Sequence, residues 1–321
     1  MKLIIQIPCY NEEGTLESVI SDLPKEIQKI DVIETLVIDD GSTDRTVEIA
    51  RKSGVDHIVS FKTNKGLAKA FAAGIEYALD QGADIIVNTD GDNQYKGEDI
   101  PKLIAPIVNG EADVVIGTRQ IDDVPHFSFF KKKMQKLGST IIRKISKAPV
   151  KDATSGFRAF SKEAAMRINP LTEYSYTIES LVQLGNEKLK IVSTPIQVNP
   201  KLRESRLIKN TPSFIAHQSL TLFRMYTVYK SFRVFIYIGL LVTLPGLFGF
   251  LRFLYFYFTG EGGGHIQSLL FSSVLVICGF FILIFGVIAD LVSSNRKMIE
   301  MMLYKIRKME LNDRSRTEDE D

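Results

Sequence analysis

Short apolar runs alternate with helix-like segments along the first 200 residues of the chain. The apolar runs are three to five residues long and rich in Ile, Val and Leu, which is typical of buried strands. They occupy residues 3–7, 35–38, 57–59, 84–87 and 113–116. Apolar residues at helical spacing fill the stretches between them, at residues 15–27, 43–51, 67–79 and 100–108. This alternation predicts an α/β domain whose mostly parallel sheet is covered by helices on both faces.

The pattern changes after this domain. Between residues 211 and 233, polar residues recur every three or four positions among large apolar ones, which predicts an amphipathic helix at the level of lipid headgroups. A core-facing helix of the domain would give the same pattern. Residues 234–258 are then apolar apart from Arg252, and residues 266–291 are apolar until Asp290. Each run exceeds the roughly 20 residues that span a bilayer, so we predict a transmembrane hairpin rather than two core helices.

Charges beside the two spans predict their orientation. Basic residues precede the first span and follow the second, whereas the loop between them contains no Lys or Arg. Both termini and the first domain are therefore expected on the cytoplasmic side of the cell membrane. The expected parts are a domain at 1–210, the amphipathic helix at 211–233, the hairpin at 234–291 and a tail at 292–321. Two lone spans bury little surface, so a homo-oligomer formed through the hairpin is a further expectation.

Composition excludes several classes of protein. The 321 residues include 40 basic and 38 acidic ones, and the net charge of +2 gives no indication of a nucleic-acid partner. The four histidines lack the spacing of metal ligands, and the two cysteines lie in different parts of the chain, so we expect no disulfide. Residues 3–7 are too short an apolar run for a signal peptide.

Asp90 and Asp92 flank Gly91 directly after the strand expected at 84–87. Ligands bind parallel sheets beyond the carboxyl ends of the strands, so these carboxylates lie where a ligand is expected. Two acids one residue apart are costly to hold together unless a hard cation neutralises them. Mg²⁺ or Mn²⁺ that also binds a diphosphate would do so.

Six motifs occur in order along the domain and together resemble the family 2 glycosyltransferases of the GT-A fold, in particular the polyprenyl-phosphate sugar transferases. They are IPCYNEE (7–13), DDGSTD (39–44), NKGLAKAFAAG (64–74), DGDNQ (90–94), GTR (117–119) and DATSGFRAF (152–160). The resemblance covers about the first 210 residues, and the hairpin also resembles that of two-span bacterial members. It implies a Rossmann-like catalytic domain that transfers a sugar with inversion from a GDP- or UDP-sugar to a polyprenyl phosphate.

The resemblance also implies roles for individual residues. Asp90, Asp92 and Gln94 match the metal-binding set, and Asp92 is a catalytic candidate. The residues expected at the nucleotide sugar are Pro8, Tyr10, Glu12, Asp40, Asp90 and Gln94. Capping of a helix is the alternative for Asp40, Ser42 and Asp44. Gly66 is expected either to open a helix whose first backbone N–H groups could face a phosphate, or to serve as a plain turn glycine. Gly74 is expected to allow close helix packing.

Basic residues complete the expected site. Arg119 matches a catalytic residue that grips the acceptor phosphate, with a structural salt bridge as the less favoured alternative. Lys133 and Lys136 belong to the segment FKKKMQKLGS, at a site where relatives commonly carry Arg and Ser. We expect them at the lipid phosphate or anionic headgroups, although a solvated charged face is the alternative. Arg206 matches the second of two basic residues in a family loop that closes on the donor, and it is a catalytic candidate. The first of the two falls on Pro200, so its role at the donor is either lost or taken by Arg203. Asp152 and Glu179 are candidates for binding sugar hydroxyls.

Three other functions remain open. A family 2 transferase could act on a growing polysaccharide or a glycolipid, although the chain lacks the Trp of the QxxRW motif that polysaccharide synthases carry. A transporter would need more spans than one hairpin provides. An inactive membrane scaffold would not need the complete set of Asp90, Asp92 and Gln94.

Overall fold

The computed structural model describes residues 1–119, 140, 142–143, 146, 148–150, 152–169, 176–200, 211–260 and 262–320. The chain forms two compact units, one of Met1–Ala216 together with Leu303–Asp321 and one of His217–Met302.

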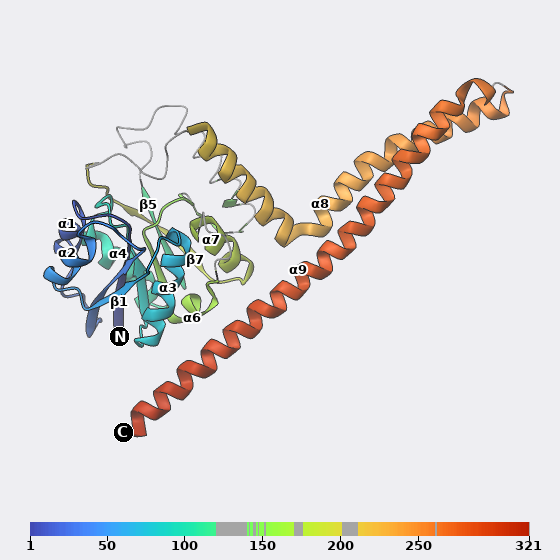
Figure 1. The fold of residues 1–321 in the computed structure, drawn as a ribbon. Coiled ribbons are helices and arrows are strands. Elements are labelled where there is room, and N and C mark those ends of the chain that lie inside the picture. The colour runs from blue at the N-terminus through green and yellow to red at the C-terminus, as the bar shows by residue number, and fades with distance from the viewer. Residues whose placement is uncertain are drawn as a thin grey trace. The chain divides into compact units, whose positions relative to one another are not determined.

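A seven-stranded sheet forms the centre of the first unit. Its strands are β1 (Lys2–Cys9), β2 (Val32–Asp39), β3 (His57–Ser60), β4 (Ile85–Asn88), β5 (Val114–Arg119), β6 (Arg158–Ser161) and β7 (Ile191–Ile196). They lie in the order β3-β2-β1-β4-β6-β5-β7. Figure 1 labels β1, β5 and β7 within this sheet. Neighbouring strands are parallel except where β6 pairs with β4 and β5. The predicted α/β class with a mostly parallel sheet is therefore confirmed.

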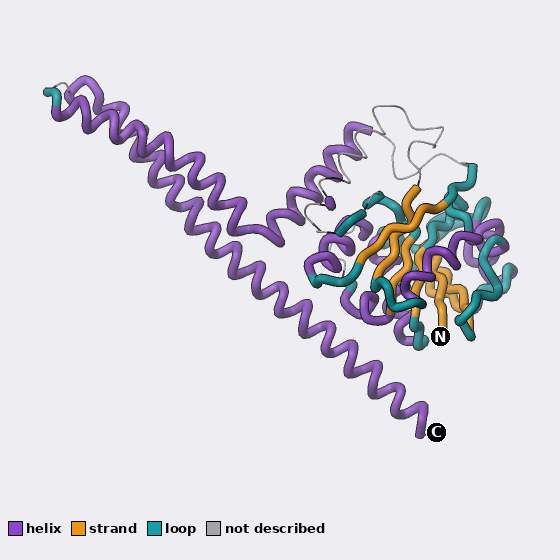
Figure 2. The backbone as a smooth tube through the Cα atoms, turned by 180° about the vertical axis from the view of Figure 1, so that it is seen from behind, coloured by secondary structure: helices purple, strands orange, loops and turns teal. Residues whose placement is uncertain are grey.

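Helices cover both faces of this sheet (Figure 2). One face carries α1 (Leu16–Ser21), α2 (Thr46–Lys52) and α4 (Ile100–Val108), the last preceded by the short 3-10 helix η1 (Gly97–Asp99). The other carries α3 (Leu67–Asp80), α6 (Lys162–Arg167) and α7 (Tyr176–Asn186). Gly74 lets α3 approach the sheet, as predicted, because a Cβ there would overlap Gln6 Oε1 and lie 2.7 Å from Ile38 Cδ1.

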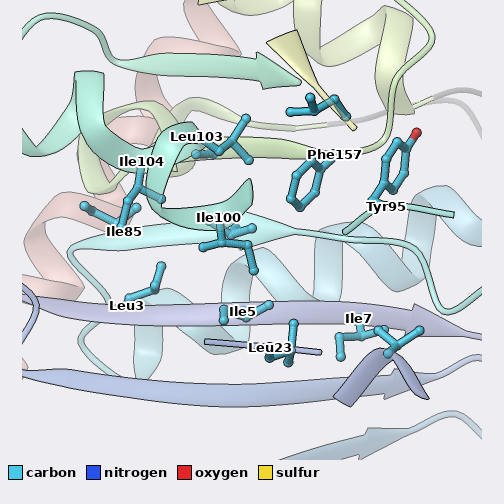
Figure 3. Packing of buried hydrophobic residues seen from close by; sticks show 14 of the residues in the cluster. Leu3, Ile5, Ile7, Leu23, Ile85, Tyr95, Ile100, Leu103, Ile104 and Phe157 are labelled. Carbon is cyan, nitrogen blue, oxygen red and sulfur yellow. The ribbon is translucent and has the colours of Figure 1, made fainter. Parts of the chain in front are cut away.

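The core between β1 and the first helix layer follows from strand alternation. Leu3, Ile5 and Ile7 point to one face of the sheet, where they meet Ile100 and Leu103 of α4 (Figure 3). All five side chains are fully buried. Tyr95 and Phe157 continue this layer toward the carboxyl ends of the strands, with ring centroids 5.1 Å apart.

The predicted elements differ from the observed ones in two ways. The helix expected at 15–27 ends at Ser21, because Pro24 disfavours helical dihedrals in the residue before it. Strands β6 and β7 and helices α6 and α7 were absent from the prediction. β6 inserts antiparallel between β4 and β5, which are parallel neighbours in the simple βαβ pattern.

The second unit is built from two long helices joined by the 3-10 helix η3 (Gly262–His265). Helix α8 (Thr211–Phe258) contains one residue with non-helical dihedrals, Lys230, and α9 (Ile266–Glu320) begins after η3. The segments Lys230–Phe258 and Gly263–Asp313 are long and apolar enough to cross a membrane, and an 18-residue stretch within each has a mean hydropathy of 2.2 and 2.8, respectively. Large apolar side chains such as Leu241, Phe248 and Phe258 are 73%, 73% and 81% exposed, unlike those of core helices. These helices indicate membrane association.

Glycines bring α8 and α9 close together. A Cβ at Gly246 of α8 would lie 2.9 Å from Leu275 Cβ, and one at Gly279 of α9 would overlap the side chain of Thr243. Small residues allow membrane helices to approach in this way. Because these glycines already serve contacts within one chain, the predicted homo-oligomer would need another face of the hairpin.

Candidate functional site

The motif residues gather at one edge of the sheet because the parallel strands all end there. Loops follow β1 at Tyr10, β2 at Asp40 and β4 at Thr89, and Arg119 is the last residue of β5. Strand β6 runs the other way, so it begins at this edge, and residues 152–157 join the site from before the strand.

The loops after β1 and β2 form one hydrogen-bonded unit. Asn11 N donates to Ser42 Oγ at 2.9 Å, and Thr43 N donates to Asn11 Oδ1 at 2.8 Å. Glu12 N donates to Thr46 Oγ1 at 2.8 Å. The first two motifs therefore hold each other in place.

The acidic residues of the second motif bind backbone N–H groups. Asp40 is 3% exposed and accepts hydrogen bonds from Lys65 N at 2.7 Å and Gly66 N at 2.9 Å. Gly66 is the N-cap of α3 with φ +93°, which favours glycine, so it opens a helix as predicted. The anion bound at this helix start is the Asp40 carboxylate. Asp44 Oδ1 accepts from Thr46 N at 3.0 Å at the start of α2, in agreement with the capping interpretation.

Other residues expected at the nucleotide sugar differ in accessibility. Pro8 is buried in β1, and Glu12 is 8% exposed and accepts a hydrogen bond from Thr15 Oγ1 at 3.1 Å. Tyr10 is 40% exposed at the same edge. Of these three residues Tyr10 is thus the accessible one, and the role of all three at a nucleotide stays a prediction.

Asp90 and Asp92 are half-buried on the loop after β4, and Asp92 Oδ1 accepts a hydrogen bond from Gln94 N at 3.1 Å. Burial and the neighbouring Asp92 carboxylate raise the pKa of Asp90 to about 7. Both causes disfavour the charged form of Asp90, and a divalent cation bound beside it would favour that form. The donor set fits a hard cation: two carboxylates and an amide leave room for the waters that Mg²⁺ retains. The described residues contain no cluster of three or more His, Cys, Asp or Glu that would form a richer site.

Two glycines allow close packing around the loop that carries these carboxylates. A Cβ on Gly91 would lie 2.9 Å from Cys9 Sγ, and one on Gly156 would lie 2.8 Å from Asp90 Oδ1. Gly156 is fixed in turn, because its N–H donates to Tyr95 Oη at 3.1 Å and its carbonyl accepts from Asn88 Nδ2 at 2.8 Å.

Arg119 makes a two-point ion pair with Asp152. Arg119 Nε lies 2.7 Å from Asp152 Oδ2, and Nη2 lies 3.1 Å from Oδ1 and 3.0 Å from Thr154 Oγ1. Burial would raise the pKa of Asp152, but the Arg119 guanidinium and hydrogen bonds hold it below its usual range. The structural salt bridge that sequence reasoning ranked second is thus present. A phosphate-binding role for Arg119 stays a prediction, and Asp152 is engaged by a guanidinium rather than open to a sugar.

Two buried polar residues of this region were missed by sequence reasoning. Gln6 Nε2 donates to Asn88 Oδ1 at 2.8 Å, and Asn88 Nδ2 also reaches Tyr176 Oη at 3.1 Å. A polar residue inside the apolar runs LIIQIP and DIIVN was the available signal. Arg158, fully buried at the start of β6, was also missed although it lies within a recognised motif.

Four expected site residues, Lys133, Lys136, Arg203 and Arg206, lie outside the described residues, and their roles stay predictions. Val198 and Asn199, which precede Arg203 and Arg206 in the sequence, lie beside the loop that carries Asp92. Asn199 N donates to Gln94 O at 2.9 Å, and Val198 forms a bridge with Tyr95.

The sequence of this chain is similar to sequences of known proteins. Residues 4–168 match the model of the family described as glycosyl transferase family 2. A UDP-N-acetylglucosamine–dolichyl-phosphate N-acetylglucosaminyltransferase of Methanococcus voltae is 31% identical over 213 residues, covering 60% of this chain and 83% of the relative. A dolichol-phosphate mannosyltransferase of Pyrococcus furiosus is 31% identical over 224 residues, covering 67% of this chain and 61% of the relative.

The fold has a counterpart among solved structures. A glucosyl-3-phosphoglycerate synthase of Mycobacterium tuberculosis, solved with Mn²⁺, UDP and glucosyl-3-phosphoglycerate, superposes with a TM-score of 0.54. The match covers 70% of this chain and 78% of that one at 21% identity, so it bears on the fold alone. The GT-A fold expected from the six motifs is thereby confirmed.

Proposed function

Because this chain belongs to glycosyl transferase family 2 and is therefore a glycosyltransferase, we propose that it transfers a sugar from a nucleoside diphosphate sugar to a polyprenyl phosphate. The observation that carries the proposal is the presence, in one chain, of a carboxylate-lined sheet edge and two exposed apolar helices of membrane-spanning length. The first suits a soluble diphosphate donor, and the second suits an acceptor that resides in a bilayer. The two relatives at 31% identity, whose names specify dolichyl or dolichol phosphate, support this acceptor class.

The donor is expected along the loops after β1, β2 and β4. Tyr10 offers an exposed ring, and Glu12, Asp40 and the Asp90–Asp92 loop offer carboxylates. Asp90, Asp92 and Gln94 would hold Mg²⁺ or Mn²⁺. When bound, this ion supplies positive charge to the diphosphate leaving group.

The acceptor needs little activation by the protein. A phosphomonoester has a second pKa of about 6 and is therefore largely a dianion at neutral pH, so it can attack the anomeric carbon directly. Direct attack inverts the anomeric centre. The work of the chain is then to position both substrates and to stabilise charge, with Arg119, Lys133 and Lys136 at the acceptor phosphate and Arg203 and Arg206 closing on the donor.

The membrane arrangement is part of the same proposal. The amphipathic segment 211–233 and the hairpin would hold the catalytic domain at the cytoplasmic leaflet, where nucleotide sugars are available. Basic residues on both flanks of the hairpin and their absence from its loop support this orientation.

The test uses full-length protein in lipid with Mg²⁺ or Mn²⁺, polyprenyl phosphate and a panel of radiolabelled GDP- and UDP-sugars. We expect label in the organic phase, and its loss on addition of EDTA; the productive donor names the sugar. Hydrolysis of a donor without lipid product would instead favour another acceptor, such as a glycolipid or polysaccharide. No turnover of any donor, under conditions where a relative works, would favour the inactive scaffold.

A further inference from the structure

Arg158 is a buried guanidinium whose hydrogen-bond acceptors among the described residues are all uncharged. It is the first residue of β6 and is 1% exposed. Nε donates to Ser155 O at 2.8 Å, and Nη2 donates to Ala153 O at 2.9 Å. Nη1 donates to Thr177 O at 2.7 Å and to Ser180 Oγ at 3.1 Å. One side chain therefore binds the loop before β6 and the first turns of α7.

Burying the Arg158 guanidinium away from water costs free energy, and its hydrogen bonds indicate what offsets that cost. Burying a cation without an anionic partner is unfavourable unless its donors are satisfied. The fork of Arg reaches separate carbonyl groups in one plane, which the single ammonium group of Lys cannot do. Arg158 thus fixes the path of a short loop that has no regular secondary structure of its own.

That loop holds the side chains around Arg119. Ala153 and Ser155, whose carbonyls Arg158 binds, lie on either side of Thr154. Thr154 Oγ1 and the Asp152 carboxylate are the groups that bind Arg119 at 2.7–3.1 Å. The contacts run in series, from Arg158 to the loop backbone, from the loop to Asp152 and Thr154, and from these to Arg119.

We propose that Arg158 is a positioning residue for sugar transfer, which sets the guanidinium of Arg119 through the backbone of residues 152–155. The inference rests on the proposed function in one respect, because it takes Arg119 to act on a substrate phosphate. A Lys at position 158 keeps the charge but loses the fork, so the loop relaxes and Arg119 moves. A displacement of about 1 Å in a group that binds a reacting substrate can cost on the order of 100-fold in rate.

A residue that merely stabilises the fold would behave differently. Its replacement would lower stability and activity independently of Arg119. A residue that acts through Arg119 has no further effect once the function of Arg119 is lost. The two roles are therefore separated by a double-mutant cycle rather than by either variant alone.

The experiment compares wild type, Arg158→Lys, Arg119→Lys and the double variant as full-length protein in lipid, with kcat and KM for polyprenyl phosphate. The control is Arg167→Lys, an Arg of α6 paired with Glu163 and Glu187. We expect R158K to lower kcat/KM on the order of 10- to 100-fold, and the double variant to lie within about threefold of R119K. R167K should stay near wild type. Losses that multiply in the double variant would overturn the inference.

A second measurement does not depend on the reaction. Amide hydrogen exchange in R158K should speed up in the peptide covering residues 152–157 and remain unchanged in β1 and β4. Unchanged exchange of 152–157 would overturn the inference even if activity falls. If wild-type protein transfers no sugar to polyprenyl phosphate, the proposed function fails, while the exchange result still decides whether Arg158 holds the loop.

If R158K does not fold, a milder substitution takes its place in the experiment. If R158K shows no cooperative thermal transition, the cycle is repeated with Ser180→Ala, which removes the side-chain acceptor of Nη1. The expected loss of kcat/KM is then about threefold, again absent in the R119K background. An equal loss in both backgrounds would overturn the inference.

Discussion

Arg119 and Asp152, from strand β5 and the loop before β6, form a bidentate ion pair in which the Arg side chain is 10% exposed and the Asp side chain is fully buried. Parallel N–H···O bonds of this kind fix the plane of the guanidinium as well as its position. The pair thus joins two motifs that are separated by 33 residues along the chain.

Replacing Asp152 by Asn should destabilise the first unit. The change leaves the Arg119 cation buried without its anion, which typically costs about 3 kcal/mol. The free energy of unfolding can be measured from urea unfolding of the full-length protein in detergent. The control is Glu163→Gln, whose pair with Arg167 is 39% and 25% exposed and should contribute below about 1 kcal/mol. Equal losses in both variants would contradict the buried pair.

Replacing Asp92 by Asn should weaken the binding of the metal ion. With one carboxylate fewer, the Mg²⁺ or Mn²⁺ concentration at half-maximal transfer should rise about tenfold or more, equivalent to about 1.4 kcal/mol. The measurement is a metal titration of sugar transfer in lipid. Glu76→Gln, an exposed position on α3, should leave the midpoint unchanged. A D92N protein with the wild-type midpoint and rate would refute the metal role.

Asp90 should make stability depend on pH in protein kept metal-free with EDTA. Because its pKa is raised from 3.8 to about 7, the folded state holds a proton that the unfolded chain has lost. Its contribution to the free energy of unfolding therefore falls as pH rises from about 4 to about 7, and is constant above that. Asp90→Asn lacks this titration. The difference in stability between the two proteins should change by up to about 1.4 kcal/mol per pH unit in this window, and a flat difference would contradict the shift.

Replacing Gly156 by Ala should disturb the carboxylate pair. The added Cβ would lie 2.8 Å from Asp90 Oδ1 and Tyr176 Oη, so the carboxylate must move. We expect transfer to fall on the order of 10- to 100-fold, with a higher metal midpoint. Gly14→Ala is the matched control, because a Cβ there meets nothing within 4 Å. Equal activity of the two variants would show that Asp90 tolerates the displacement.

A cysteine placed in the hairpin loop should be reachable from outside the cell. In a Cys278→Ala background, in which the remaining Cys9 is buried, Gly263→Cys should react with a membrane-impermeant maleimide on intact cells. Asp313→Cys should react after permeabilisation but not before. The reverse pattern would invert the predicted topology.

The edge of the sheet that carries the site could be predicted because its signals are local. Each motif directly follows an apolar run, so Asp40, Asp90 and Arg119 could be placed at strand ends from the sequence. The start of α3 at Gly66 and the close packing of Gly74 were also predictable, since both depend on the special stereochemistry of glycine.

The remainder depends on contacts between distant segments. The position of β6 between β4 and β5 is set by pairing with residues 42 to 76 positions earlier, for example of Arg158 with Ile116 and Asn88, and no local period encodes it. Arg158 and Asp152 stand in a recognised motif, yet their bonds to Thr177 and Arg119 require the folded chain. Asp40 illustrates the same limit, since helix capping could be proposed for it from the sequence, but not that the helix would be α3, which begins 27 positions later.

The length of the first apolar helix has a consequence for the bilayer itself. Lys230–Phe258 contains 29 residues, which at about 1.5 Å per residue gives roughly 43 Å, against a hydrocarbon thickness of about 30 Å. If this helix spans the bilayer, the excess is taken up by tilt or by ends that reach the headgroup layers. Tyr255 and Tyr257 near one end and Arg233 near the other suit those layers. A span of this length would tolerate thicker and thinner membranes by a change of inclination, which would let the enzyme work across changes in lipid composition.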